Sequence, residues 1–235
     1  MTDSSDAIEA RPGLHSKWRG VVDSLEVIIP IYEKGSSRIS LFSDKVMRDE
    51  VAEFATAVPK DRPILDLGAG PGTLARVVAR DGGTPVLADA SRKMLALAAP
   101  FDRVQCVFEN LPFREGSFGA AVAGFSLRDA QDLQTALSEI SRSLGSGGRF
   151  AFCDLGKPNS KVKARLVGGY IAVAPPVIGF LTGGRRGLRF GSLRETYKLV
   201  LDNKALCRVL ARYFKSVAIK ERQMGGSIVG KCSLV

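Results

Sequence analysis

The sequence predicts an α/β protein, in which a mostly parallel seven-stranded sheet carries helices on both faces and ends in an antiparallel hairpin. Three observations predict this fold. Short apolar runs alternate with amphipathic segments between residues 63 and 154, and a glycine-rich turn follows the first run. Two alternating segments near the C-terminus, 216–220 and 227–232, are separated by a Gly-Gly turn. Alternating strands and helices favour parallel pairing, because the chain must cross over between successive strands.

The first 58 residues precede this alternation. Residues 1–16 are polar and are predicted to be a disordered tail. Apolar residues at helical spacing predict a helix from Trp18 that Pro30 ends, then a turn over 31–35. A second helix is expected over 44–58, with Ser43 or Asp44 as its cap. We therefore expect a tail (1–16), an N-terminal helical cap (17–58) and a main domain (59–235).

The main domain begins with a regular series of elements. Strands are expected at 63–67, 84–89, 104–108, 120–125 and 149–154, and the helices between them at 72–80, 91–99 and 129–144. Ser91 is expected to cap the helix that begins there. In open parallel sheets, ligands bind beyond the carboxyl ends of the strands. Residues 68–72, 89, 107–110 and 124–128 all fall at such ends, which predicts one shared site.

The C-terminal third has a different composition. Residues 156–190 are rich in glycine, proline and basic residues, and 192–214 are expected to form one or two helices. The longest apolar run, 170–181, is shorter than the roughly 20 residues of a spanning helix, and Pro175-Pro176 is expected to break it. With no signal-peptide pattern at the N-terminus, we expect a cytoplasmic protein, either soluble or peripheral to a membrane.

Composition and charge restrict the partners. The chain has 34 basic and 24 acidic residues, a formal charge of +10, and 45% hydrophobic residues. The basic excess favours an anionic partner, either nucleic acid or a phospholipid surface, although a generally basic soluble surface explains it equally well. Nucleic acid is disfavoured because no basic-aromatic module is appended. A single histidine, His15, and four separated cysteines predict no metal site and reduced thiols.

The most informative stretch is Ile64–Gly72, Ile-Leu-Asp-Leu-Gly-Ala-Gly-Pro-Gly, which reads as a strand, a tight turn and the start of a helix. Its spacing fits neither the G-x-G-x-x-G fingerprint nor a P-loop. Asp66 is expected to hold the turn, to reach a cationic amino group through water, or to do both. Asp89, 17 residues after Gly72, suits the two hydroxyls of a ribose, or else caps the following helix.

These residues resemble motif I of class I S-adenosylmethionine (SAM)-dependent methyltransferases. Leu111-Pro-Phe113 and Leu144-Gly-Ser-Gly-Gly-Arg-Phe150 resemble further signatures of that superfamily. Phe125-Ser-Leu-Arg-Asp129 is similar to the F-G-L-R-N segment of the ubiquinone/menaquinone biosynthesis C-methyltransferases, and Asp154-Leu-Gly-Lys-Pro158 resembles their E-F-S-K-P. Ile31-Tyr32-Glu33 resembles their Y-D. The resemblance spans roughly residues 20–225, is weakest over 160–200, and implies a Rossmann-like fold with SAM as cofactor.

The resemblance also implies site residues and a substrate. The cofactor-binding set is Asp66, Gly68, Ala69, Gly70, Gly72, Asp89, Ala90, Met94, Phe108, Glu109, Gly124 and Phe125. The catalytic set is Arg128, Asp129 and Tyr32. It implies methylation of a ring carbon of a prenylated quinol, with Arg128 stabilising a phenolate or ordering a water. The structural alternatives are an ion pair of Arg128 with Asp129 or Asp132, and an N-terminal helix that merely covers the sheet.

The sequence departs from the family pattern at several positions. Val107 stands where the family usually has Asp or Asn, so adenine recognition is expected to rest on the Phe108 backbone and apolar packing. Gly119, Gly124, Asp129 and Ser146 also replace residues that are usual there. Three other functions stay open: a methyltransferase of another small or lipid acceptor, a nucleic-acid methyltransferase, and a non-catalytic SAM-binding partner in quinone biosynthesis.

Two expectations concern larger partners. The apolar run 170–181, followed by Arg185, Arg186 and Arg189, predicts docking on an anionic bilayer by a segment (about 160–200) that faces the substrate. A helix packed on the core, followed by a basic loop, explains the same pattern. A homodimer is also left open.

Overall fold

The computed structural model of the chain describes residue 20, residues 23–24 and residues 26–235. The expected tail (1–16), Trp18 and His15 lie outside these residues. In the described part, the sheet has seven strands in the order β3-β2-β1-β4-β5-β7-β6. Their bounds are β1 (Ile64–Leu67), β2 (Pro85–Asp89), β3 (Asp102–Gln105), β4 (Phe118–Gly124), β5 (Leu144–Leu155), β6 (Ser216–Arg222) and β7 (Ser227–Ser233). Strands β1 to β5 are parallel, and β7 runs antiparallel to both β5 and β6, as the sequence predicts.

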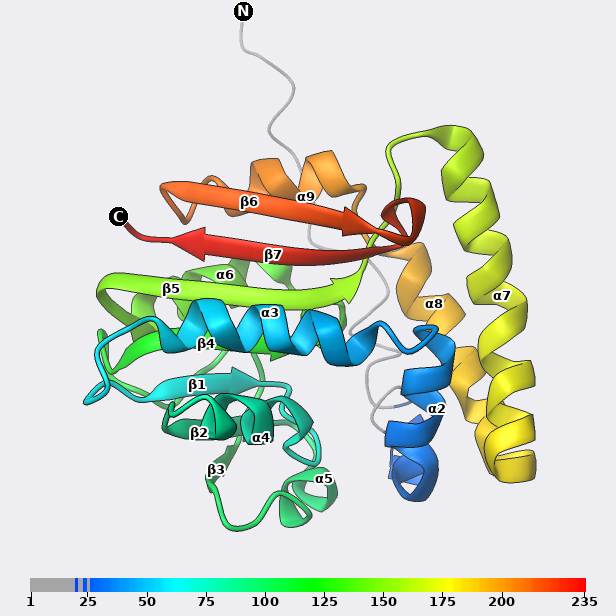
Figure 1. Cartoon of the computed structure of the whole chain (residues 1–235), viewed down its shortest axis with the longest axis horizontal. Coiled ribbons are helices and arrows are strands. Elements are labelled where there is room, and N and C mark those ends of the chain that lie inside the picture. The colour runs from blue at the N-terminus through cyan, green and yellow to red at the C-terminus, as the bar shows by residue number, and fades with distance from the viewer. Residues whose placement is uncertain (1–19, 21–22, 25) are drawn as a thin grey trace, which may run out of the picture.

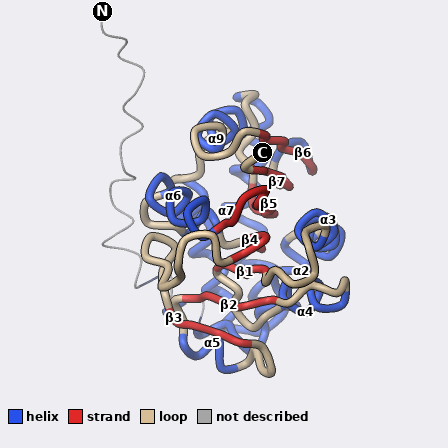
Figure 2. Tube along the Cα trace, turned by 90° about the vertical axis from the view of Figure 1, so that its left-hand side faces the viewer, coloured by secondary structure: helices blue, strands red, loops and turns tan. Residues whose placement is uncertain are grey.

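Helices cover both faces of the sheet (Figure 2). The helices are α2 (Tyr32–Ile39), α3 (Asp44–Thr56), α4 (Thr73–Arg80), α5 (Arg92–Ala96), α6 (Leu133–Ser143), α7 (Lys161–Gly183), α8 (Leu193–Lys198) and α9 (Asn203–Leu210). Short 3-10 turns are η1 (Ile29–Ile31), η2 (Leu127–Asp129), η3 (Gly184–Ser192) and η4 (Gln223–Gly225). Helices α3 and α4 lie on one face, and α6 and α9 on the other. Helices α2, α7 and α8 gather beyond the ends to which the arrows of β1 and β5 point (Figure 1).

The alternation of side chains along each strand builds two cores. Leu65 and Leu67 face the side covered by α6 and α9, where Phe150 and Phe152 stack at a ring distance of 5.4 Å. Ile64 faces the other side and packs with residues of α3 and α4. Because successive strand side chains point to opposite faces, four consecutive buried residues in β1 supply both cores.

Helix starts follow their caps. Ser91 accepts a hydrogen bond from the Met94 backbone N–H, as expected, so α5 begins at Arg92. Asp132 accepts one from Thr135, so α6 begins at Leu133 and not at residue 129. Ser43 precedes α3 but makes no side-chain cap bond, whereas Asp44 accepts bonds from two serine hydroxyls.

One prediction at the first proline is confirmed, and two others are wrong. The α-helical residues before Pro30 end at Ile28, and Pro30 lies in the 3-10 turn η1, where a missing N–H has no helical partner to lose. The turn expected over 31–35 is wrong, because the chain continues directly into α2. Pro175 and Pro176 do not break the apolar run, because α7 continues through both. Ile171 before them and Gly179 after them stay buried on the same face, so packing on both sides holds the helix together.

Two strand boundaries also differ. The third strand is β3 (Asp102–Gln105) rather than 104–108, and Val107 instead forms an isolated bridge with Asn110. The strand expected over 149–154 is β5, which already starts at Leu144, includes the glycine-rich residues 145–148 and shifts register against β4 near its beginning. Glycine-rich sequence there therefore marks an irregular strand, since glycine tolerates such a bulge.

Candidate functional site

The loop between β1 and α4 is the first part of the site. Its three glycines have left-handed backbone angles, with φ of +60°, +55° and +80° at Gly68, Gly70 and Gly72. Gly68 also faces a close neighbour, because a Cβ there would lie 2.4 Å from the Cβ of Ser126. Both constraints require glycine at this position. The loop therefore lies so close to the residues after β4 that no side chain fits at Gly68.

Asp89, at the end of β2, is tied to this loop. Its Oδ2 accepts a hydrogen bond from the Gly70 backbone N–H at 2.8 Å, and its Oδ1 accepts one from the Ser91 N–H at 2.7 Å. Burial raises the pKa of Asp89, and these N–H groups oppose that effect. A carboxylate offers about four acceptor positions, so two remain for ribose hydroxyls. Ser91, not Asp89, supplies the side-chain cap of α5.

A cavity of about 90 Å³ opens between the carboxyl ends of β1, β2 and β4. Eight of the twelve predicted cofactor residues line it: Gly68, Gly70, Asp89, Ala90, Met94, Phe108, Glu109 and Phe125. Asp66, Ala69, Gly72 and Gly124 do not reach its wall. Glu109 has a further task, because its Oε1 accepts hydrogen bonds from the backbone of Gln131 and Asp132 and so fixes the approach to α6.

Sequence reasoning missed several residues of this cavity. Ser126 and Cys106 line it, and the Ser126 hydroxyl donates to the Leu67 carbonyl at 2.7 Å. Burial raises the pKa of the Cys106 thiol to about 11, so this cysteine stays protonated. Both residues follow a strand, and that position was the only signal that pointed to them. Val107 also lines the cavity, and the apolar packing expected there around the adenine stays a prediction.

Asp66 lies beneath the glycine loop and is fully buried. Neither of its carboxylate oxygens accepts a close hydrogen bond within the described part of the chain, although the backbone N–H of Ala75 acts on the carboxylate more weakly. Burial raises its pKa to about 7, and the nearby positive charge of Arg48 opposes that shift. Asp66 does not reach the cavity wall, so it fits the amino group of SAM only through water or across the glycine loop, where a nearby cation would offset the cost of its burial.

Arg48, on α3, occupies the space beside Gly124. Its guanidinium lies over the Phe125 ring, 5.0 Å from the ring centre, and is buried. A Cβ at Gly124 would lie 2.5 Å from the Arg48 Nη1. Gly119 is similar, since a Cβ there would lie 2.6 Å from that of Arg62. Both departures from the family pattern therefore make room for arginine side chains.

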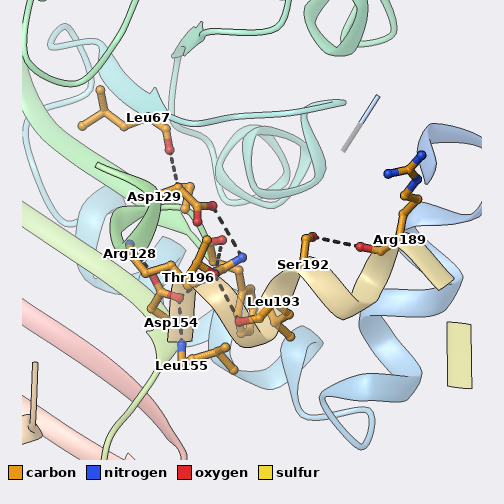
Figure 3. Close-up of polar contacts among 11 residues, drawn as sticks. Leu67, Arg128, Asp129, Asp154, Leu155, Arg189, Ser192, Leu193 and Thr196 are labelled. Carbon is orange, nitrogen blue, oxygen red and sulfur yellow. Dashed lines mark hydrogen bonds and ion pairs between the residues drawn. The ribbon is translucent and has the colours of Figure 1, made fainter. Parts of the chain in front are cut away.

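Arg128, in η2, is held between two carboxylates (Figure 3). Its Nη1 lies 2.8 Å from the Asp154 Oδ1, its Nη2 lies 3.5 Å from the Asp129 Oδ2, and its Nη1 also donates to the Phe125 carbonyl. Burial alone would lower the pKa of Arg128, but the two carboxylates outweigh it and raise the pKa. Arg128 therefore stays charged and cannot act as a base.

The partners of Arg128 differ in part from expectation. The ion pair with Asp129 is present, whereas Asp132 caps α6 instead. Asp154, at the end of β5, was assigned no role from the sequence, yet it also accepts the Arg128 backbone N–H at 2.9 Å. An acidic residue at the end of a parallel strand was the available signal.

A second cavity of about 220 Å³ adjoins the first. Tyr32, Phe125, Arg128 and Asp129 line both cavities, so the three predicted catalytic residues stand where the two meet. Burial raises the pKa of Tyr32, which keeps its hydroxyl protonated. The remaining wall is mostly apolar and comes from α2, α7, α8 and their flanking turns; it includes Ile28, Ile39, Leu155, Leu166, Val167, Ile171, Phe190 and Leu193.

Comparison with known proteins gives consistent results. A family model described as a methyltransferase domain matches residues 65–152. A demethylmenaquinone methyltransferase of Clavibacter sepedonicus is 29% identical over 223 residues, covering 91% of this chain and 89% of that protein. One from Mycobacterium marinum is 28% identical over 224 residues, covering 94% and 95%. A solved SAM-dependent methyltransferase from Thermotoga maritima aligns with a TM-score of 0.61 at 14% identity, over 90% of this chain and 100% of that one, which shows the fold alone.

Together, the fold, the glycine loop and these similarities define a class I SAM-dependent methyltransferase, an enzyme that uses SAM as its cofactor. Within this class, the chain resembles the ubiquinone/menaquinone biosynthesis C-methyltransferases, as residues 125–129 and 154–158 predict. The prediction of the family resemblance is thus confirmed. The roles of individual site residues stay predictions.

Proposed function

We propose that the enzyme methylates a ring carbon of a prenylated quinol of the menaquinone or ubiquinone type. The observation that carries this proposal is the apolar cavity that meets the cofactor cavity at Tyr32, Arg128 and Asp129. An apolar ring with one polar edge fits such a space, because the wall is mostly apolar and the charged side chains of Arg128 and Asp129 stand at the junction. Relatives named for demethylmenaquinone and for 2-phytyl-1,4-naphtoquinone, at 29% and 30% identity, support the same substrate class.

The chemistry needs few groups. Bound SAM supplies an electrophilic methyl group, and the protein must hold the ring carbon in line with it at about 3–3.5 Å. A quinol ring carbon is a nucleophile when the neighbouring hydroxyl loses its proton. We propose that Arg128 contacts the oxygen of that hydroxyl, where its positive charge stabilises the phenolate. The new C–C bond would form as the methyl–sulfur bond breaks, with the neutral thioether as the leaving group. The ring carbon then releases its hydrogen as a proton, and the ring becomes aromatic again.

Asp129 and Tyr32 complete the proposed site. Asp129 stands beside Arg128 and lines both cavities, so its carboxylate is placed to receive the hydroxyl proton. Tyr32 keeps its own proton and can donate a hydrogen bond to the second quinol oxygen. Asp154 holds Arg128 from the side away from the ring, through both the side chain and the backbone N–H. It is therefore a positioning residue, not a catalytic one.

The test is a methyl-transfer assay with purified protein, labelled SAM and chemically reduced demethylmenaquinone carrying a short prenyl tail, solubilised in detergent. We expect a product heavier by one CH₂ group, and NMR should place the new methyl on a ring carbon. A methyl on oxygen would contradict C-methylation. Turnover only with unrelated phenols or lipids would support the second candidate, a methyltransferase of another small or lipid acceptor. SAM binding without transfer to any acceptor would contradict both.

A further inference from the structure

The outer face of α7 is apolar and uncovered. Along this 23-residue helix, Val162, Leu166, Val173, Val177, Phe180 and Leu181 expose between 50% and 77% of their surface. Their spacing puts them on one side of the helix, over about 30 Å. No charged residue occurs from residue 166 to residue 184. Figure 1 shows α7 at the edge of the molecule, with no other element beyond it in that view. A patch of this size on a soluble protein marks a binding surface.

The inner face of α7 is firmly attached to the protein. Val167, Ile171 and Pro175 are buried on it, and Val167 and Ile171 pack with residues of α8. The Tyr170 hydroxyl donates to the Ile39 carbonyl of α2 at 2.8 Å. One helical stretch in the described part of the chain, Lys161–Lys198, is long and apolar enough by composition to cross a membrane, with 22% of its most apolar window buried. Because α7 is packed along its inner face, it can only lie against a surface while the protein stays folded.

Charges flank this apolar face at both ends. Lys161, Lys163 and Arg165 are exposed at the start of α7, and Arg185, Arg186 and Arg189 are exposed just after it. No acidic residue occurs anywhere from 161 to 194. An apolar stripe with positive charge at both ends complements a phospholipid surface, whose acyl layer accepts the stripe and whose anionic headgroups accept the cations.

The mouth of the larger cavity lies beside this face. Leu41, Leu166 and Met224 line the cavity and are each 59–60% exposed, and the neighbouring Phe42 is 70% exposed. Leu41, Phe42 and Met224 also have left-handed φ angles of 53°, 60° and 60°, which non-glycine residues rarely adopt. The side chains of Leu41, Phe42 and Met224 are therefore exposed to water near the opening of the cavity.

We propose that the outer face of α7 docks flat on an anionic phospholipid bilayer, with Leu41, Phe42 and Met224 inserted around the cavity mouth. The acceptor then passes from the bilayer into the cavity without crossing water. A second copy of this chain is the competing occupant. Pairing two α7 faces would bring basic ends together in either orientation, because both ends are basic and neither has an acidic counterpart.

Vesicle binding tests the docking without any quinol, so its outcome is independent of the proposed reaction. We expect the protein to sediment with vesicles of phosphatidylcholine and phosphatidylglycerol, and much less with phosphatidylcholine alone or at high salt. The combined variant Val173→Ser, Val177→Ser, Phe180→Ser and Leu181→Ser should weaken binding by more than about 10-fold. None of these four residues lines either cavity, so SAM affinity and thermal stability should match wild type.

The charge requirement has its own variants. Replacing Arg185, Arg186 and Arg189 by glutamine should weaken binding to the anionic vesicles by at least about 10-fold. The same change at Arg92, Arg103 and Arg208, which are exposed on other elements, is the matched control and should have a smaller effect. Equal binding to neutral and anionic vesicles, or full binding by the four-serine variant, would overturn the proposal. The proposal would also be overturned if light scattering showed a dimer for wild type and a monomer for the four-serine variant. The outer face of α7 would then bind a second copy of the chain.

Discussion

Asp66 gives the sharpest quantitative prediction. Its carboxyl group is completely buried, and burial raises its pKa from 3.8 to about 7. The folded protein therefore binds a proton at Asp66 more tightly than the unfolded chain does. Between about pH 4 and pH 7, folding takes up a proton, so the free energy of unfolding falls as the pH rises through this window. Above about pH 7 the loss is complete and amounts to about 4 kcal/mol, at about 1.4 kcal/mol for each pH unit.

Asp66→Asn removes this titration. The variant buries an amide that also lacks a partner, so its absolute stability includes an extra cost of about 1–3 kcal/mol. That cost is the same at every pH and cancels when two pH values are compared. Between pH 5 and pH 8, we therefore expect the free energy of unfolding of wild type to fall by about 3 kcal/mol more than that of the variant. Urea unfolding followed by circular dichroism at both pH values measures this, with Asp61→Asn as an exposed control. An identical pH dependence in wild type and Asp66→Asn would refute the reasoning.

The same residue links SAM binding to protons. If the SAM amino group stands near Asp66, its positive charge lowers the Asp66 pKa, and binding at pH 6.5 releases roughly three-quarters of a proton. Isothermal titration calorimetry in two buffers of different ionisation enthalpy measures that release. Asp66→Asn should bind SAM more weakly and release almost no proton. Release that the substitution leaves unchanged would assign the proton to another group.

Three other substitutions test separate parts of the structure. Asp89→Ala removes a charged acceptor and should weaken SAM binding by about 10-fold or more in calorimetry; unchanged affinity would exclude the ribose role. Arg128→Lys cannot hold two carboxylates and a phenolate at once, so we expect kcat to fall by about 100-fold with the SAM Kd within about 3-fold, and normal turnover would remove Arg128 from the mechanism. Gly230→Ala places a Cβ 2.1 Å from the Phe152 ring and should destabilise the fold by about 1–3 kcal/mol, whereas Gly169→Ala meets open space and should not; equal melting temperatures would contradict this.

The sheet and the outline of the site follow from local patterns. Strand and helix periods, and the glycine turn after Leu67, are set by neighbouring residues, so they predict the parallel strands and their carboxyl ends. Because those ends share one edge, residues 68–72, 89 and 124–128 could be gathered into one site before any contact was known. The three predicted catalytic residues do meet at the junction of the two cavities.

What sequence patterns could not predict depends on contacts between distant segments. Pro175 sits in the middle of α7 because residues of α8 and η3 pack on both sides of it, and no local rule contains that information. Arg48 reaches Gly124 across 76 positions, and Asp154 reaches Arg128 across 26. A glycine that departs from a family pattern, such as Gly124, makes room for a side chain from another element, and no local pattern contains that information.

The two cavities differ in how their walls are encoded. The cofactor cavity is built mostly from residues 65–152, the range that the methyltransferase-domain model matches. The larger cavity takes most of its wall from α2, α7, α8 and the turns beside them, which lie outside that range. The segment with the weakest resemblance, 160–200, thus lines the cavity that we propose holds the acceptor, and it also carries the outer face of α7. On the proposed function and the proposed docking, one helix would contact the acceptor with one face and the bilayer with the other.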